Sequence, residues 1–180
     1  MNHYKSKISE RTLSNQLNLS RTTLRKALSF DESVKLSTLK KIANYFDRTI
    51  KVITYPKSHT PNCTTVSTSF RIAKDGFGSW KIHLMEMVDE FRKTKDMRIF
   101  LLPPDSCCPE KINALIAATV IELCDEQGFQ TPEWALSIKP LEEPWFVSEM
   151  NSLKASALLE SPFSFRCKNI FVHDNFLLRA

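Results

Sequence analysis

Apolar residues recur at helical spacing along most of the chain, and only three glycines interrupt the pattern. Five side chains of residues 78–93 share one helical stripe: Trp80, Leu84, Met87, Val88 and Phe91. This stripe predicts an amphipathic helix. Residues 109–128 are apolar nearly all round, with Pro109 suited to the first turn and Gly128 to the C-terminal cap. We therefore expect a central helix there and a mainly α fold.

Shorter segments predict the remaining elements. The β-branched run RTIKVIT at residues 48–54 is typical of a short strand, and MRIFLLPP at 97–104 predicts a strand or a buried extended segment that its prolines end. TPEWAL predicts a short helix opened by Thr131, and residues 148–160 predict another helix. The chain then closes with an aromatic segment, FVHDNFLLRA.

Residues 13–28, LSNQLNLSRTTLRKAL, contain two apolar-periodic runs separated by a tight turn. Leu13 and Leu17 lie on one face of the first run. Asn18 can adopt the left-handed conformation that such a turn requires, and we expect Leu19 to be buried in the turn. The pattern therefore predicts two helices joined by a few residues.

The second of these helices carries polar side chains that could contact a ligand. Ser20 is suited to cap its N-terminus. Three apolar residues are expected to face inward: Leu24, Ala27 and Leu28. Four polar residues then lie on the outer face: Arg21, Thr22, Arg25 and Lys26. Residues at the start of such a helix meet base edges in the major groove, where Arg offers paired donors to guanine and Thr a hydroxyl or a methyl group.

A third helix is predicted at residues 36–46, with Ser37 as its candidate cap. Its expected core stripe is Leu39, Ile42, Ala43 and Phe46. An exposed helix N-terminus that presents Ser37 and Thr38 beside Lys35 is suited to binding a phosphate group.

Charge is distributed unevenly along the chain. Residues 1–55 hold eleven Lys and Arg against four Asp and Glu, a net +7, whereas residues 56–180 carry a net −2. Residues 56–69 are rich in Pro, Ser and Thr without an apolar period, which predicts a linker. We therefore expect a polyanion-binding domain at 1–55 and a helical partner-binding domain at 70–180.

Several classes of protein are disfavoured. No run approaches the roughly 20 apolar residues of a membrane span, and residues 1–10 lack the apolar stretch of a signal peptide, so a cytoplasmic protein is expected. Five cysteines without metal or redox spacing predict reduced thiols: Cys63, Cys107, Cys108, Cys124 and Cys167. No nucleophile motif, glycine-rich loop or metal-ligand spacing surrounds the titratable residues considered for catalysis: His83, Glu86, Glu90, His173 and Asp174. We expect no enzyme, no cofactor and no metal.

The motif LSNQLNLSRTTLRKAL, followed by VKLSTLKKIANYF, resembles the helix-turn-helix of the phage-repressor, or Xre, family over residues 9 to about 47. The resemblance implies a transcriptional regulator that binds double-stranded operator DNA. The residues expected to contact bases are Ser20, Arg21, Thr22, Arg25 and Lys26. The residues expected to contact phosphates are Arg11, Lys35, Ser37, Thr38, Lys40 and Lys41.

The strand predicted at 48–54 resembles the ending of Xre-type antitoxins of the persistence-kinase class, in which such strands pair across a dimer. The residues of this dimer strand would be Ile50, Val52 and Thr54. A homodimer would contact two half-sites of a pseudo-palindromic operator about 34 Å apart, which is one turn of DNA.

Residues 142–180 resemble the closing segment of a family of uncharacterised prokaryotic proteins in which a Pro-Trp-Phe, a Ser-Pro, a Phe-Arg and a final Arg-Ala recur. The resemblance implies an antitoxin that represses its own operon and binds a nucleotidyltransferase-like toxin through residues 70–180. Five aromatic residues are expected in the core, with a partner-binding surface as the alternative: Trp145, Phe146, Phe163, Phe165 and Phe171. The candidates for partner contact are Trp145, Phe146 and Phe165.

Three alternatives remain at this stage. The C-terminal helices could enclose a small-molecule effector, which would make the chain a ligand-sensing regulator. The basic end could instead dock an acidic protein, as in a structural adaptor. Finally, the two N-terminal helices could be an ordinary helical hairpin whose basic residues form a solvated face.

Overall fold

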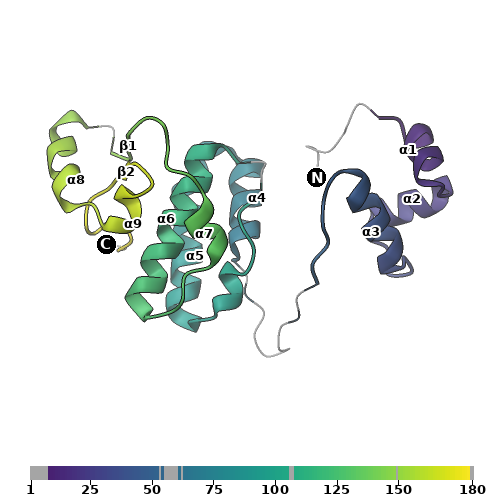
Figure 1. Cartoon of the computed structure of the whole chain (residues 1–180), viewed down its shortest axis with the longest axis horizontal. Coiled ribbons are helices and arrows are strands. Elements are labelled where there is room, and N and C mark those ends of the chain that lie inside the picture. The colour runs from purple at the N-terminus through teal and green to yellow at the C-terminus, as the bar shows by residue number, and fades with distance from the viewer. Residues whose placement is uncertain are drawn as a thin grey trace. The chain divides into compact units, whose positions relative to one another are not determined.

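The chain divides into two units, Met1–His59 and Thr60–Ala180, called here the N-terminal and the C-terminal unit. The computed structural model describes residues 8–52, 54, 61, 63–105, 108–148 and 150–178. Helices dominate both units within these residues, so the prediction of a mainly α fold is confirmed (Figure 1). The prediction for Cys107 lies outside the described residues.

The N-terminal unit consists of three short helices. They are α1 (Glu10–Leu17), α2 (Arg21–Leu28) and α3 (Leu36–Tyr45). Its buried apolar core is small: Leu13, Leu17, Leu24, Ala27 and Ile42. Leu39 and Phe46 of the predicted α3 stripe pack against this core while half-buried. Leu19 is likewise half-buried, where the sequence predicted full burial.

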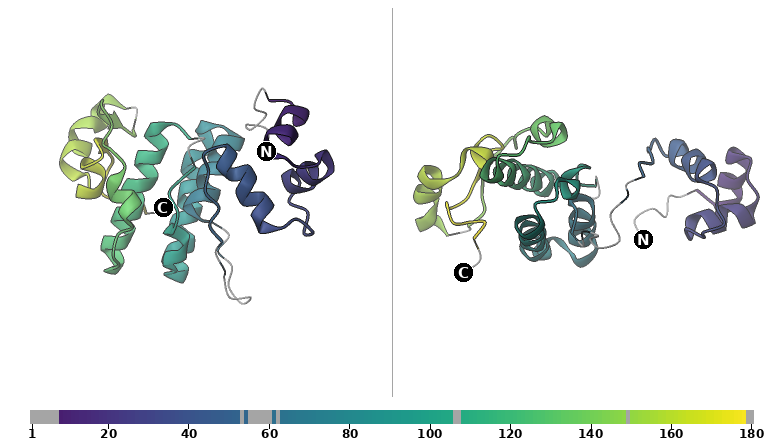
Figure 2. Two further views of the ribbon diagram at one scale, coloured as in Figure 1. Left: turned by 45° about the vertical axis from the view of Figure 1, so that its right-hand side comes forward. Right: turned by 90° about the horizontal axis from the view of Figure 1, so that it is seen from below.

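The C-terminal unit contains longer helices and short connecting elements. In chain order they are α4 (Thr65–Asp75), η1 (Phe77–Ser79), α5 (Trp80–Thr94), η2 (Met97–Phe100), α6 (Glu110–Gln127), α7 (Glu133–Ser137), β1 (Trp145–Phe146), η3 (Asn151–Leu153), α8 (Lys154–Glu160), α9 (Phe163–Arg166) and β2 (Ile170–Phe171). Helix α6 lies at the centre and contacts α4, α5, α7 and α9 (Figure 2). The helix predicted at 109–128 is confirmed to within one residue at each end: Pro109 is its N-cap and not a residue of the first turn, and Gly128 ends it in the left-handed conformation.

The composition of α6 explains its central position. Its residues are apolar on nearly every face, so it must be covered on all sides. Eleven of them are buried: Ile112, Ala114, Leu115, Ile116, Ala117, Ala118, Thr119, Val120, Ile121, Leu123 and Cys124. The predicted stripe of α5 packs against the same core, with Leu84, Met87, Val88 and Phe91 fully buried and Trp80 half-buried.

A two-stranded parallel sheet holds the C-terminal segment against the rest of this unit. β1 pairs with β2 in the register Trp145 to Ile170 and Phe146 to Phe171. The hydroxyl of Ser161 accepts a hydrogen bond of 2.8 Å from the Val172 N–H just beyond β2. Sequence patterns missed these strands because two residues are too few to show a period.

Several predicted boundaries were wrong. Helix α4 begins at Thr65, inside the predicted linker 56–69, because Thr64 and Ser67 form a reciprocal capping box that a Ser- and Thr-rich composition disguises. Residues 97–100 form the 3₁₀ helix η2 instead of an extended segment. Helix α7 begins at Glu133 after Pro132, so Thr131 does not open it. The helix predicted at 148–160 is shorter and begins as η3.

The strand predicted at 48–54 is absent from the single chain, since residues 48–52 and 54 have no regular secondary structure. A strand needs a pairing partner for its backbone groups, and none of the described residues supplies one to this segment. Pairing across a dimer, which one chain cannot display, stays a prediction.

Candidate nucleic-acid interface

The turn between α1 and α2 has the predicted geometry. Asn18 adopts the left-handed conformation, with φ 49° and ψ 50°, and ends α1. The N–H of Leu19 donates back to the Ser14 carbonyl at 2.9 Å. The Ser20 hydroxyl then caps α2 by accepting a 3.0 Å hydrogen bond from the N–H of Thr23. The predictions for Asn18 and Ser20 are confirmed, and these two residues fix the direction in which α2 leaves α1.

The two faces of α2 differ sharply in burial. Leu24 is fully buried and Ala27 is 2 % exposed. The four residues predicted on the outer face are all exposed: Arg21, Thr22, Arg25 and Lys26. Leu28, however, is 43 % exposed, so the prediction that it faces inward was wrong. It is the last residue of α2, beyond the reach of α1 and α3 in this small core.

The outer face of α2 is connected to its surroundings by two side-chain contacts. Arg25 Nε donates to Glu10 Oε2 at 2.9 Å. Lys26 Nζ lies 3.5 Å from the Ser33 hydroxyl in the loop that follows α2. Asp31 of the same loop accepts hydrogen bonds from the hydroxyl and N–H of Ser33, and these bonds lower the pKa of its carboxyl group.

Ser20 is occupied as a cap. Besides accepting from the Thr23 N–H, its hydroxyl shares a 2.8 Å hydrogen bond with the Thr23 hydroxyl. These two hydrogen bonds use two of the three hydrogen-bonding positions of the hydroxyl, which leaves one for the base contact predicted from the sequence.

The start of α3 differs from its prediction. Helix α3 begins at Leu36, after Lys35, and no side chain caps it, so Ser37 is a helical residue and not the cap. The first N–H groups of this helix are consequently left without a side-chain acceptor, which suits them to an external anion.

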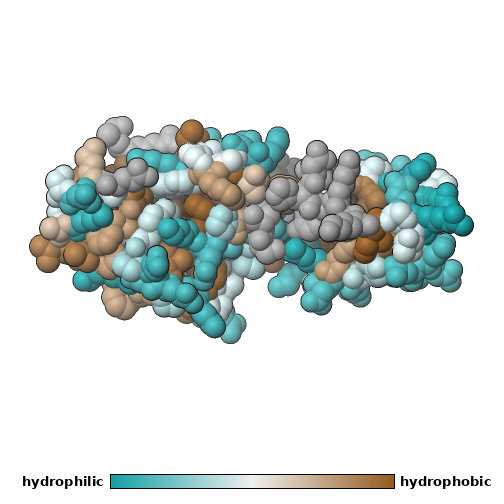
Figure 3. Space-filling view, turned by 90° about the horizontal axis from the view of Figure 1, so that it is seen from above, coloured by the Kyte–Doolittle hydropathy of each residue, from teal (hydrophilic) through white to brown (hydrophobic). Residues whose placement is uncertain are grey.

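The residues predicted to contact phosphates lie on α1 and around α3, and none lies on α2. Thr38 is half-buried, and the remaining members are exposed: Arg11, Lys35, Ser37, Lys40 and Lys41. Figure 3 shows hydrophilic side chains gathered at the end of this unit that α1 and α2 form.

The residues predicted for a dimer strand differ in exposure. Val52 is 69 % exposed, Thr54 is exposed and Ile50 is half-buried. Val52 and Thr54 are thus accessible to a pairing chain.

The aromatic residues of the C-terminal unit differ from their predicted roles. Phe165 is fully buried and packs against Phe176 at 5.5 Å, so its prediction as a partner contact was wrong. Phe163 is 74 % exposed, so its prediction as a core residue was also wrong. Phe163 and Phe165 are two positions apart in the four-residue helix α9, and at 3.6 residues per turn such positions lie on opposite sides of a helix.

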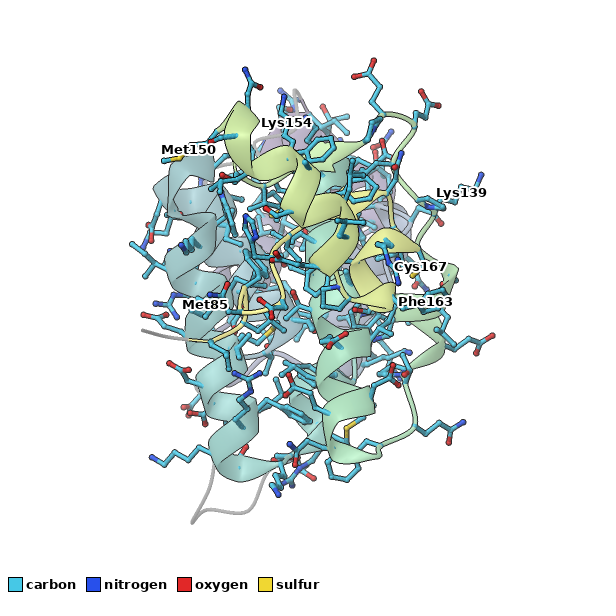
Figure 4. The ribbon with its side chains drawn as sticks, turned by 90° about the vertical axis from the view of Figure 1, so that its left-hand side faces the viewer. Met85, Lys139, Met150, Lys154, Phe163 and Cys167 are labelled. Atoms are coloured by element: carbon cyan, nitrogen blue, oxygen red, sulfur yellow. The ribbon has the colours of Figure 1, made fainter. Side chains whose placement is uncertain are left out.

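Trp145 and Phe146 are half-buried and already have partners within the unit. The Phe146 ring stacks on the Phe171 ring with 5.0 Å between centroids, and Lys154 Nζ lies over the Phe146 ring, 5.6 Å from its centroid. The ring centroids of Trp145 and Trp80 lie 6.1 Å apart. The exposed apolar side chains of this region are instead Met150, Leu158, Leu159 and Phe163, on and beside α8 and α9 (Figure 4).

The histidines considered for catalysis have carboxylate partners on separate elements. His83 of α5 is 5 % exposed, and its Nε2 lies 2.9 Å from Asp75 Oδ2. His173 Nδ1 lies 2.9 Å from Glu160 Oε2. Among the described residues, no group of three or more His, Cys, Asp or Glu is placed to hold a metal ion.

The described cysteines, Cys63, Cys108, Cys124 and Cys167, are free thiols. Burial raises the pKa of Cys124 to about 11 and also raises the pKa of Cys63. Thiols in this state are poor nucleophiles at neutral pH.

An open cleft of about 390 Å³ lies between the start of α5 and the C-terminal segment. Its lining combines apolar and polar side chains, among them Trp80, Lys81, His173, Asn175 and Phe176. Trp80 stacks on Phe176 at 6.2 Å and forms one wall.

Comparison with known protein families, with curated proteins and with solved structures finds nothing that matches the chain. Within the described residues, no helix combines the length and the apolar character that crossing a bilayer requires.

Proposed function

We propose that the chain is a sequence-specific DNA-binding regulator of transcription that contacts operator DNA through α2. The observation that carries this proposal is the outer face of α2, where Arg21, Thr22 and Arg25 are exposed directly after a tight, capped turn. The first turns of a helix presented in this way fit the major groove, and Arg and Thr are residue types that distinguish base edges.

Affinity for DNA would come from the basic surface around this helix. Arg11, Lys40 and Lys41 are exposed, and the uncapped start of α3 offers N–H donors beside Lys35. Each phosphate neutralised releases counterions, so the observed affinity should fall steeply as the salt concentration rises. The net charge of +7 on residues 1–55 agrees with such a role.

We further propose that the regulator acts as a homodimer and as the antitoxin of a toxin–antitoxin pair that represses its own operon. Ile50, Val52 and Thr54 would pair between the two protomers, and the operator would contain two half-sites about 34 Å apart. The C-terminal unit would bind the toxin. Because Phe165 is buried, the exposed apolar residues Leu159 and Phe163 replace it as contact candidates.

The test is a footprint of the purified full-length protein on the DNA upstream of its own gene at two salt concentrations. We expect two protected patches one helical turn apart that weaken at the higher salt concentration. Arg25→Ala should abolish protection while the circular dichroism spectrum stays unchanged, because one bidentate contact to guanine is lost. The matched control is Arg166→Ala, which removes an exposed arginine of the C-terminal unit and should leave the footprint intact.

Two other results would contradict the proposal. Binding to duplex DNA without sequence preference and with a weak salt dependence would favour an adaptor that docks an acidic protein. A protected region identical for wild type and Arg25→Ala would remove α2 from the interface.

A second candidate function is a ligand-sensing regulator, favoured by the cleft between Trp80, Lys81 and His173. Its volume of about 390 Å³ is within the range of small-molecule sites. In that case a metabolite mixture should raise the melting temperature of the protein, and a co-expressed product of the neighbouring gene should not. The opposite result would favour the antitoxin.

A further inference from the structure

Glu10 and Arg25 form an ion pair between two helices of the N-terminal unit. Glu10 is the first residue of α1, and Arg25 lies on the outer face of α2. Arg25 Nε donates to Glu10 Oε2 at 2.9 Å, while the two side chains remain 69 % and 50 % exposed for Arg25 and Glu10. Pairs as exposed as this contribute little to folding stability, so the fold itself gains little from it.

The contact uses one edge of the guanidinium group. Nε is bound to Glu10, while the two terminal nitrogens of the outer edge make no hydrogen bond to any residue that the structure describes. These two nitrogens can donate two parallel hydrogen bonds to O6 and N7 of guanine. The pair therefore holds Arg25 by its inner nitrogen and leaves its base-recognition edge available.

Fixing the Arg25 side chain before DNA binds affects the specificity of binding. A free arginine loses rotamer freedom when it binds, and a preorganised one loses less. At the same time, a carboxylate beside the DNA repels phosphates and lowers affinity for any sequence. Glu10 would thus strengthen correct base contacts relative to non-specific binding, which is how a residue raises discrimination without raising total affinity.

From this geometry we infer that Glu10 is a specificity-determining residue: it positions Arg25 to bind guanine in the operator and selects against non-specific DNA. The inference depends on the proposed function, since it assigns a role within the same interface. Glu10 itself is a positioning residue, and Arg25 makes the base contact.

The experiment measures the ratio of operator affinity to non-specific affinity with full-length protein. The probes are the footprinted operator, the same operator with each base pair changed in turn, and a duplex of scrambled sequence. For Glu10→Ala we expect this ratio to fall about tenfold, at the base pair that Arg25 contacts. The affinity for the scrambled duplex should rise, because one negative charge near the DNA has been removed.

Two variants separate positioning from simple charge. Glu32→Ala removes an exposed acid from the loop after α2 and makes the same change in net charge. It should raise the affinity for both DNA types without altering their ratio. Glu10→Gln keeps an acceptor oxygen for Arg25 Nε and should retain most of the wild-type ratio.

A double variant tests whether Glu10 acts through Arg25. In an Arg25→Ala background, the additional change Glu10→Ala should leave the ratio of operator affinity to scrambled-duplex affinity at the value of Arg25→Ala alone, because no guanidinium remains to be positioned. Melting curves of each variant ensure that the ratios are compared between folded proteins.

Distinct outcomes overturn the inference and the proposed function. An unchanged ratio in Glu10→Ala, or an equal fall in Glu32→Ala, overturns the role of Glu10 while the wild-type footprint still supports the regulator. A wild-type protein without any sequence preference overturns both.

Discussion

The two units of the chain differ in their large buried side chains and in their net charge. Among the largest fully buried side chains of the described residues, Leu24 alone belongs to the N-terminal unit, whereas Phe91, Phe100 and Phe165 belong to the C-terminal unit. The N-terminal unit instead carries the net charge of +7 within residues 1–55. A domain of this size buries a smaller share of its surface than a larger one, so its folding depends on few residues. The candidate DNA interface therefore rests on a small core, and the buried aromatic rings lie in the C-terminal unit.

The largest expected effect is on that small core. Leu24→Ala removes the fully buried side chain at its centre, and changes of this kind cost about 2–5 kcal/mol. This is comparable to the whole stability of a small unit, so we expect the N-terminal unit to unfold and DNA binding to be lost. Amide hydrogen exchange should show lost protection in α1–α3 and retained protection in α6.

Leu28→Ala is the matched control for this variant. Leu28 is 43 % exposed, so its truncation should change the stability by no more than about 0.5 kcal/mol. If Leu24→Ala also lowered protection in α6, the two units would unfold together, and the contrast between them would be wrong.

An intermediate effect is expected in the C-terminal unit at Lys168. This lysine is 4 % exposed, and its ammonium group donates to the carbonyl oxygens of Leu136, at 3.2 Å, and of Ile138, which lie at the end of α7. Lys168→Met leaves both carbonyls without this donor. We expect a loss of about 1–3 kcal/mol in chemical denaturation, with Lys139→Met, at an exposed lysine, as a near-neutral control.

The same lysine predicts a dependence on pH. Burial lowers the pKa of Lys168 from its ordinary value of 10.5. Between the lowered pKa and 10.5, the unfolded chain keeps a proton that the folded chain has released. The free energy of unfolding contributed by this group therefore rises with pH across that window. Lys168→Met should lack this rise, and an identical pH profile for both proteins would show that the lysine is not buried in solution.

The smallest expected effect is a gain in the N-terminal unit. Phe30 adopts a left-handed conformation with φ 55° while its side chain is 72 % exposed. The left-handed conformation costs a residue with a Cβ atom about 1 kcal/mol of folding free energy, and glycine does not have this cost. Phe30→Gly should therefore raise the free energy of unfolding of this unit by about 1 kcal/mol.

Ser29→Gly provides the comparison for that gain. Ser29 has a negative φ of −90°, so glycine there relieves no strain. It adds freedom to the unfolded chain and removes the 3.0 Å hydrogen bond from the Ser29 hydroxyl to the Lys26 carbonyl, so it should lower stability. Equal effects of the two substitutions on the melting temperature would refute the role of the left-handed conformation.

Local chemistry made part of the structure predictable. The left-handed Asn18, the Ser20 cap and, to within one residue, the limits of α6 were predicted correctly, because each depends on residues within about four positions of one another. The outer face of α2 was predictable for the same reason, since helical spacing alone separates it from Leu24 and Ala27. Leu28 was not, because its burial depends on whether another helix reaches the end of α2.

The sequence by itself determined the helical class, the capped turn and the basic face of α2, since these follow from spacing, cap chemistry and charge. Only the tertiary structure decided which aromatic ring of α9 is buried, that residues 145–146 and 170–171 pair, and that Glu10 binds Arg25 fifteen positions away. The physical reason is distance along the chain. Contacts between remote residues depend on how whole elements pack, and no local pattern records that packing.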